Sequence, residues 1–157
     1  MTKTQLTRNF SLHELTKSET AARHDMPNEP GSVEIANLVD LAAKVLQPIR
    51  DHFAKGVHIN SGFRHPDVNA KVGGSRTSDH CKGMAADLEI PGVPNAELAQ
   101  WVKDNLEFTQ LILEFYTPGI PDSGWVHVSY DPKNLKKQVM TATKQGGKTV
   151  YLPGLVA

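Results

Sequence analysis

Apolar residues recur at helical spacing in two parts of the chain. Between residues 33 and 54 an apolar side chain returns every three or four positions, which predicts one long amphipathic helix. Pro48 lies inside this stretch, so we expect a bend there, and Gly56 is expected to end the helix. A shorter helix with the same spacing is predicted for residues 95–106, with Asn95 as its N-cap.

Other segments alternate apolar and polar residues with the period of two that is typical of β-strands. The four clear ones are residues 57–60, 84–90, 110–115 and 124–130. Two weaker β-like pieces follow in the tail, residues 131–157, and they either complete the sheet or cover one rim of it. Because no helix separates the last two clear strands, we expect an α+β fold: a small, mostly antiparallel sheet with helices packed on one side.

The alternation places a chemically competent side chain on the non-core face of three of these strands. It is Asp87 in the second strand, Glu114 in the third and His127 in the fourth, each flanked along the chain by apolar residues. His80 stands just before the second strand, near the end of a polar, turn-rich stretch at residues 61–81. We interpret that stretch as a long loop, and long ordered loops in compact domains are usually functional.

Composition narrows the class of protein. Of the 157 residues, 39% are apolar and 22% are charged, which is ordinary for a globular protein, so we expect a single domain over residues 1–157. Seventeen basic and seventeen acidic side chains give a net charge of +0, which argues against nucleic-acid binding. Cys81 is the only cysteine, so an intrachain disulfide and a zinc site built on cysteine pairs are excluded.

Two imidazoles and one carboxylate, from His80, Asp87 and His127, are ligands of the types that a catalytic zinc ion prefers. Zinc lowers the pKa of a bound water to about 7, and Glu114 would take the proton of that water and pass it to a leaving amine. Arg64 would clamp a substrate carboxylate or carbonyl with its planar guanidinium group. The competing interpretation is that each of these residues is an ordinary polar group of the surface or core.

Trp125 would form an aromatic wall beside such a site. Cys81, next to His80, is an alternative nucleophile, but free cysteine usually behaves as a small hydrophobic residue. No third group is evident that would orient a cysteine–histidine pair, so this alternative is the weaker one. Residue types and spacing alone therefore favour zinc hydrolysis without deciding it.

The residues around these candidates resemble a known family. Ser78-Asp-His-Cys-Lys-Gly-Met-Ala-Ala-Asp87 resembles the S-x-H-x-x-G-x-A-x-D signature of the D-Ala-D-Ala carboxypeptidase family of zinc peptidases, and Gly124-Trp-Val-His127 resembles its W-x-H element. Ile59-Asn-Ser-Gly-Phe-Arg64 resembles the S-G-[FY]-R motif that carries the substrate-binding arginine of the family. The resemblance covers about residues 9–130, with the subgroup from bacteriophage lysis enzymes and bacterial cell-wall peptidases as its best match.

This resemblance implies a fold shared with the signalling domain of hedgehog proteins and a peptidoglycan stem peptide as substrate. It also implies one zinc ion, held by His80, Asp87 and His127. The candidate substrate-binding residues are Arg64, Ser78 and Trp125.

One departure from the family pattern affects the general base. Many members carry a carboxylate three residues before the last histidine ligand, where this chain has Gly124. Glu114 resembles the arrangement of the hedgehog-like branch, in which the acid stands at the end of the preceding strand. Asp122, in the loop between the two strands, is the alternative. We favour Glu114 because its position on the strand face fits.

Two functions of different class remain. The first is a zinc peptidase that hydrolyses an amide bond in the peptide part of peptidoglycan, in the manner of a phage endolysin. The alternative is a zinc-containing, hedgehog-like binding module without hydrolytic activity, which the glycine at position 124 favours and which Glu114, Arg64 and Trp125 oppose. A metal-dependent nuclease is the weakest option, because the charge balance offers no basic groove.

The sequence also carries an expectation about location. The first ten residues contain no apolar signal core, and no apolar run approaches the length that spans a bilayer. We therefore expect synthesis in the cytoplasm, no membrane insertion, and action on the cell wall, in the periplasm, if the chain is an endolysin. The neutral overall charge gives no sign of an obligate partner, so we expect a monomer.

Overall fold

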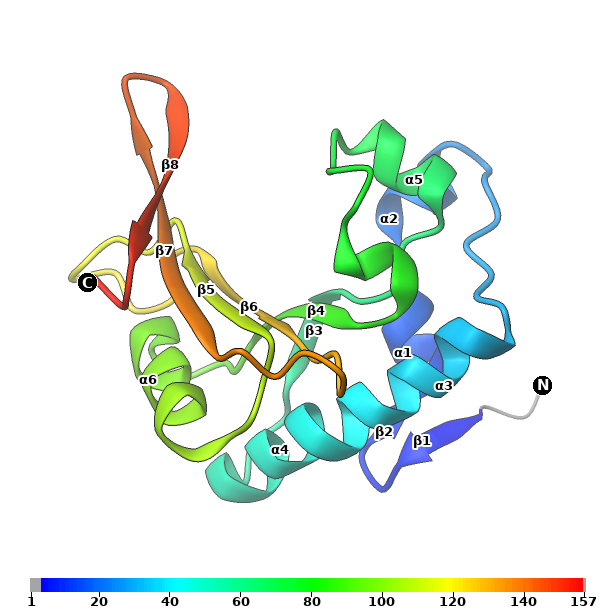
Figure 1. Cartoon of the computed structure of the whole chain (residues 1–157), viewed down its shortest axis with the longest axis horizontal. Helices are drawn as coiled ribbons and strands as arrows, with labels where there is room; N and C mark the ends of the chain where they lie inside the picture. Colours follow the sequence, from blue (N-terminus) through cyan, green and yellow to red (C-terminus); the bar gives the residue numbers. More distant parts are fainter. Residues whose placement is uncertain (1–3, 157) are drawn as a thin grey trace.

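A six-stranded sheet organises the computed structural model, which describes residues 4–156 (Figure 1). Residues 1–3 and 157, which the predicted single domain includes, lie outside the described residues. The strands of this sheet are β3 (His58–Ser61), β4 (Ala85–Glu89), β5 (Gln110–Glu114), β6 (Trp125–Ser129), β7 (Gln138–Gln145) and β8 (Lys148–Pro153). A separate short ribbon pairs β1 (Gln5–Thr7) with β2 (Phe10–Ser11).

The helical elements lie mostly in the first half of the chain (Figure 1). They are α1 (Leu12–Thr16), α2 (Glu19–Arg23), α3 (Ser32–Leu41), a π-helical turn η1 (Ala42–Leu46), α4 (Gln47–Phe53), α5 (Pro66–Lys71), a 3-10 turn η2 (Asp79–Lys82) and α6 (Asn95–Asn105). None of the helices in the described part of the chain is long and apolar enough to cross a membrane.

The strand order across the sheet is β3-β4-β6-β5-β7-β8. Every neighbouring pair is antiparallel except β5 and β7, which run parallel, so the expected mostly antiparallel sheet is confirmed. The tail therefore completes the sheet, which was one of the two possibilities that the sequence left open. After β6 the chain returns to the start of β5, where the Gln138 N–H donates to the carbonyl of Thr109 at 3.0 Å and sets the parallel register.

One face of the sheet is apolar and forms the core. The alternating residues of β4, β5 and β6 on this face are fully buried, and they share one hydrophobic cluster with residues of α3, α4 and α6. Burying each valine or leucine contributes about 1.5–3 kcal/mol, so this face fixes the register of these three strands. The opposite face carries Asp87, His127 and Glu114, each only partly buried.

The long helix predicted for residues 33–54 is interrupted. It begins at Ser32 and stays helical to Phe53, but residues 42–46 form a π-helical turn in which the Gln47 N–H bonds to the carbonyl of Ala42. Pro48 supplies the reason, since it has no N–H for the α-helical bond to a carbonyl four residues back. The helix ends at Ala54 in a left-handed conformation, two residues before the expected Gly56.

Two further expectations need correction. The stretch at residues 61–81 is not all loop, because Pro66 opens the six-residue helix α5 and a 3-10 turn holds the end of the stretch. Proline is favoured at the first position of a helix, where its missing N–H costs nothing. Asn95 is the first residue of α6 rather than its cap, which is Pro94, and its side chain donates instead to the carbonyls of Ser123 and Gly124.

Candidate metal centre

Three side chains from separate parts of the sequence meet on the polar face of the sheet. Asp87 and His127 are direct neighbours across the β4–β6 pair, and His80 reaches them from the 3-10 turn before β4. One carboxylate oxygen of Asp87 lies 2.9 Å from Nδ1 of His127, and the other lies 3.4 Å from Nε2 of His80. The three potential ligand atoms all lie within 4.8 Å of one another.

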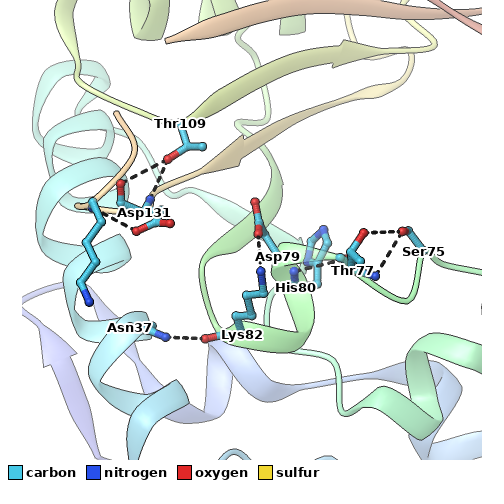
Figure 2. Close-up of polar contacts among 10 residues, drawn as sticks. Asn37, Ser75, Thr77, Asp79, His80, Lys82, Thr109 and Asp131 are labelled. Atoms are coloured by element: carbon cyan, nitrogen blue, oxygen red, sulfur yellow. Dashed lines mark hydrogen bonds and ion pairs between the residues drawn. The ribbon is translucent and has the colours of Figure 1, made fainter. Parts of the chain in front are cut away.

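Local hydrogen bonds explain why His80 stands where it does. The Ser78 hydroxyl accepts from the backbone N–H of His80 at 3.2 Å and caps the 3-10 turn, which ends at Gly83 with a φ of 74°. Figure 2 shows how the turn is tied to α3: the Asn37 side-chain amide donates to the carbonyl of Lys82 at 2.8 Å, and Lys82 pairs with Asp79. A side chain at position 83 would run into the backbone of α3 at Glu34, so glycine is required there.

A hydrogen bond to a backbone carbonyl orients the imidazole of His80. Its Nδ1 lies 2.8 Å from the carbonyl oxygen of Gly62, so Nδ1 carries the proton and donates, and Nε2 is left as the free ligand atom. Gly62 in turn packs against the end of α1, where the N–H of the next residue, Phe63, donates to the carbonyl of Leu15 at 2.7 Å. A Cβ at position 62 would collide with that Leu15 carbonyl.

The charges of the cluster favour an ionised carboxylate. Burial by itself raises the pKa of the Asp87 carboxyl, but when the two imidazoles are protonated, the charge of His80 and the hydrogen bonds from both histidines outweigh burial and hold this pKa well below its usual range. Burial works to lower the pKa of His127, whereas its hydrogen bond to Asp87 and the charge of that carboxylate raise it, and the net result is a raised pKa. Asp87 therefore carries its negative charge throughout the neutral range.

These donor atoms fit a single zinc ion. Zinc binds histidine nitrogen and carboxylate oxygen at about 2.0–2.2 Å, so tetrahedral ligands lie about 3.3–3.6 Å apart. The 3.4 Å between one Asp87 oxygen and Nε2 of His80 falls within that range, and the 2.9 Å between the other oxygen and Nδ1 of His127 is somewhat shorter. Three protein ligands leave one tetrahedral position open, which is the pattern of a catalytic rather than a structural zinc site.

Glu114 stands on the same face, at the end of β5. It pairs directly across the sheet with Trp125, whose indole N–H donates to one carboxylate oxygen of Glu114. Burial raises the pKa of Glu114 and the negative charge of Asp87 raises it further, while the charge of His127 and the tryptophan hydrogen bond offset part of the rise. A raised pKa suits a group that accepts and then returns a proton near neutral pH.

The backbone explains the glycine at position 124. Gly124 has a φ of 65°, in the left-handed region that glycine favours, and a Cβ there would collide with the backbone of Glu114 and Phe115. The residue three positions before His127 therefore has no room for a carboxylate side chain. A base in this chain has to come from another position.

A cleft of about 480 Å³ opens above the metal centre and contains most of the predicted site residues. Those that line it are Arg64, Ser78, His80, Asp87, Glu114, Trp125 and His127. Asp122, the alternative base, lines a separate cavity with Glu89 and Asn95. Cys81 lines a third cavity, and burial raises the pKa of its thiol, which keeps it protonated at neutral pH.

Arg64 lies at the junction of two cavities, because it also lines a neighbouring one of about 390 Å³ beside α2 and β3. The backbone N–H of Arg64 donates to the carbonyl of His80 at 3.1 Å, which connects Arg64 to the 3-10 turn that carries His80. Its Nε is buried and has no hydrogen-bond partner among the described residues. A buried donor without a partner is costly, and a ligand oxygen in the cleft would satisfy it.

Several residues that line the cleft were not predicted from the sequence. They include Ser75 and Thr77, whose hydroxyls bond each other at 3.0 Å (Figure 2), and Gln110. Tyr151, on β8, also lines the cleft. The polar stretch at residues 61–81 was a usable signal for the hydroxyls, whereas the position of Tyr151 depends on a strand pairing that no local pattern reveals.

Comparison with known proteins agrees with this geometry. No curated protein matches the chain. The model of the Peptidase M15 family matches residues 8–129, which is most of the chain and includes His80, Asp87 and His127. The chain therefore belongs to the Peptidase M15 family.

Proposed function

We propose that this protein is a zinc peptidase that hydrolyses an amide bond in the peptide part of bacterial peptidoglycan. Membership of the family supports a zinc-dependent peptidase as the general class. The observation that carries the proposal is the pairing of a His80–Asp87–His127 group with a free carboxylate, Glu114, in one open cleft.

The arrangement supports a division of labour. His80, Asp87 and His127 would hold the zinc ion, which when bound would supply Lewis acidity toward a water molecule and the scissile carbonyl. Glu114 takes the proton of that water and delivers it to the leaving amine, which completes hydrolysis with no net change in the enzyme. Arg64 holds a carbonyl or carboxylate oxygen of the substrate with its guanidinium group.

Trp125 has two roles in this proposal. Its indole N–H holds one oxygen of Glu114, which leaves the other oxygen free to exchange the proton. Its ring forms a wall of the cleft, as does Ser78, whose hydroxyl is already engaged in capping the turn of His80. Ser78 therefore contributes to the substrate site through the position of that turn as well as by lining it.

We further propose a lytic, endolysin-like role. The support is the likeness of the sequence motifs to the subgroup from phage lysis enzymes, together with the small catalytic unit. In this role the protein is made in the cytoplasm, remains monomeric and reaches the wall once the inner membrane is permeable. Added to bacteria with a permeabilised outer membrane, the zinc-loaded protein is expected to lower culture turbidity, and unchanged turbidity with an intact wall would contradict the role.

Digestion of purified peptidoglycan tests the proposed activity. The zinc-loaded protein is incubated with the wall and the released fragments are identified by mass spectrometry, with a parallel sample in excess chelator. We expect peptide fragments with new amino termini only in the zinc-loaded sample, and their masses name the bond. Zinc bound at one ion per chain beside an undigested wall would instead support the non-hydrolytic binding module.

The general base is tested by two matched variants. Glu114→Gln removes the proton acceptor while keeping the size and the tryptophan contact, so we expect zinc binding to persist and the rate to fall about 10²- to 10⁴-fold. Asp122→Asn, in the separate cavity, is expected to retain activity. A fully active Glu114→Gln protein beside an inactive Asp122→Asn protein would transfer the role to Asp122.

A further inference from the structure

A row of four residues crosses the sheet beside the metal ligands. Strand pairing places Trp125 of β6 opposite Glu114 of β5, Glu114 opposite Ala142 of β7, and Ala142 opposite Tyr151 of β8. Residues directly opposite one another in a sheet share a face, so Tyr151 projects on the same face as Glu114. Adjacent strands lie about 4.8 Å apart, which places Tyr151 about 10 Å from Glu114 along the row.

The residue between them is small. Ala142 contributes only a methyl group to this row, and it is fully buried, so the cleft surface at this point is formed by its larger neighbours Glu114 and Tyr151. Tyr151 itself is 52% exposed, a large value for an aromatic side chain, and it lines the same cleft as Glu114 and the metal ligands. An aromatic ring held at the edge of an open catalytic cleft is available for contact with a ligand.

The strand that carries Tyr151 rises beside the cleft. In Figure 1, the β7–β8 hairpin and the segment around α5 project on the same side of the sheet, at opposite ends of it. Residues from both ends line the cleft: Gly73, Ser75 and Thr77 on one side, and Tyr151 on the other. The hairpin lies beyond residue 129, where the family match ends, so this wall is not part of the matched region.

The order of the groups across the cleft indicates which part of the substrate lies near Tyr151. Arg64 lies beside His80, the ligands Asp87 and His127 come next on β4 and β6, then Glu114 on β5, and Tyr151 comes last on β8. The proton that Glu114 returns goes to the leaving amine. The part of the substrate that contains this amine therefore lies on the Glu114 side of the scissile bond, which is the side of Tyr151.

We propose that Tyr151 is a specificity-determining residue that contacts the amine-side portion of the substrate, the residues that leave with the new amino group. The inference rests on the proposed peptidase function and deepens it. The ring and hydroxyl of Tyr151 offer a surface for contact with the substrate. A single leaving residue lies next to Glu114 and is too short to reach this surface. Tyr151 thus favours substrates extended on that side by two or more residues, as in cross-linked stem peptides.

The test compares two synthetic peptides with the same scissile bond, one that releases a single amino acid and one that releases a tripeptide. In the zinc-loaded protein, Tyr151→Ala is expected to raise KM for the longer peptide about tenfold, a typical cost of losing an interface aromatic, and to change kcat little. KM for the shorter peptide stays within about twofold. Tyr151→Phe keeps most of the effect of the ring. Lys148→Ala, on the same hairpin but on the opposite face, is the matched control and leaves both peptides unaffected.

A binding measurement separates the inference from the proposed function. In the Glu114→Gln background, calorimetry with the longer peptide is expected to show affinity about tenfold weaker for the Tyr151→Ala double variant than for Glu114→Gln alone. Equal losses for both peptides, or no loss for either, in a protein that does cleave them would overturn the role of Tyr151. If the wild-type protein cleaves neither peptide nor peptidoglycan and binds neither peptide, the proposed function fails first and the inference falls with it.

Discussion

Gly62 offers a sharp test of how the metal centre is built, because it touches neither metal nor substrate in our account. Its carbonyl oxygen accepts from Nδ1 of His80 at 2.8 Å, and its Cα lies against the carbonyl of Leu15. In Gly62→Ala the new methyl group overlaps that carbonyl, which is backbone and cannot rotate away. The segment at residues 61–64 must therefore shift, and the acceptor that orients His80 shifts with it.

The magnitude follows from the two contacts that change. Loss of a second-shell partner of a ligating histidine typically weakens metal affinity 10- to 100-fold, which is about 1.4–2.7 kcal/mol. The overlap with the α1 backbone adds a cost to folding of about 1–3 kcal/mol. We expect Gly62→Ala to fold, to bind zinc at one site, and to bind it 10- to 100-fold more weakly than the wild type.

The assay is zinc competition with a chromophoric chelator on the metal-free protein, with urea unfolding measured in parallel. Gly56→Ala is the matched control, because a Cβ there meets nothing within 4 Å. We expect the control to keep the wild-type zinc dissociation constant. A Gly62→Ala protein that is destabilised yet keeps wild-type zinc affinity would refute the reasoning, since it would show that the Gly62 carbonyl does not position His80.

Three further predictions follow from the same structure. Removing zinc should lower the melting temperature. At a free zinc concentration of 100 times Kd, the bound ion stabilises the fold by about 2.7 kcal/mol, which corresponds to about 5–10 °C for a chain of this length. Calorimetry with and without chelator measures this shift, and the melting temperature of Asp87→Ala should not change when chelator is added. Asn28→Ala should lower the free energy of unfolding by about 1–3 kcal/mol, measured in urea. The Asn28 side chain donates to the carbonyls of Thr16 and Phe63 and accepts from the N–H of His65. An unchanged unfolding midpoint would show that these hydrogen bonds are dispensable. Gly124→Glu restores the common family pattern, but it should lower both stability and activity. The cause is the φ of 65° at this position and the collision of a Cβ with the backbone of Glu114. An activity equal to that of the wild type in the peptidoglycan digest would contradict this.

The strands and their faces could be predicted because the alternation of apolar and polar residues is visible within each strand's own sequence. Period-two alternation requires only knowledge of which residues are apolar, and it places Asp87, His127 and Glu114 on one face without any knowledge of the partner strands. The sheet pairing then brings Asp87 opposite His127, although α6 and β5 separate β4 from β6 in the chain. The alternation alone therefore selects Asp87, Glu114 and His127, whereas the grouping of His80 with Asp87 and His127 as metal ligands was predicted from residue types and the family resemblance.

Other features depend on contacts between distant segments. The π-helical turn before Pro48 and the helix that Pro66 opens are local, but short helical elements leave too few residues for a periodic pattern. The role of Gly62 depends on α1, and that of Tyr151 depends on a parallel pairing of β7 with β5 that no turn signal announces. Such non-local pairings follow from the packing of the whole chain rather than from local preference.

The most direct measurement titrates the metal-free protein with zinc and follows amide hydrolysis of purified peptidoglycan in the same samples. If His80, Asp87 and His127 hold the one ion that drives the reaction, activity rises linearly with added zinc and levels off at one ion per chain. The Asp87→Ala protein stays inactive at every ratio below saturation. Full activity in the metal-free protein, or activity that does not change as zinc binds, would contradict the account at its centre.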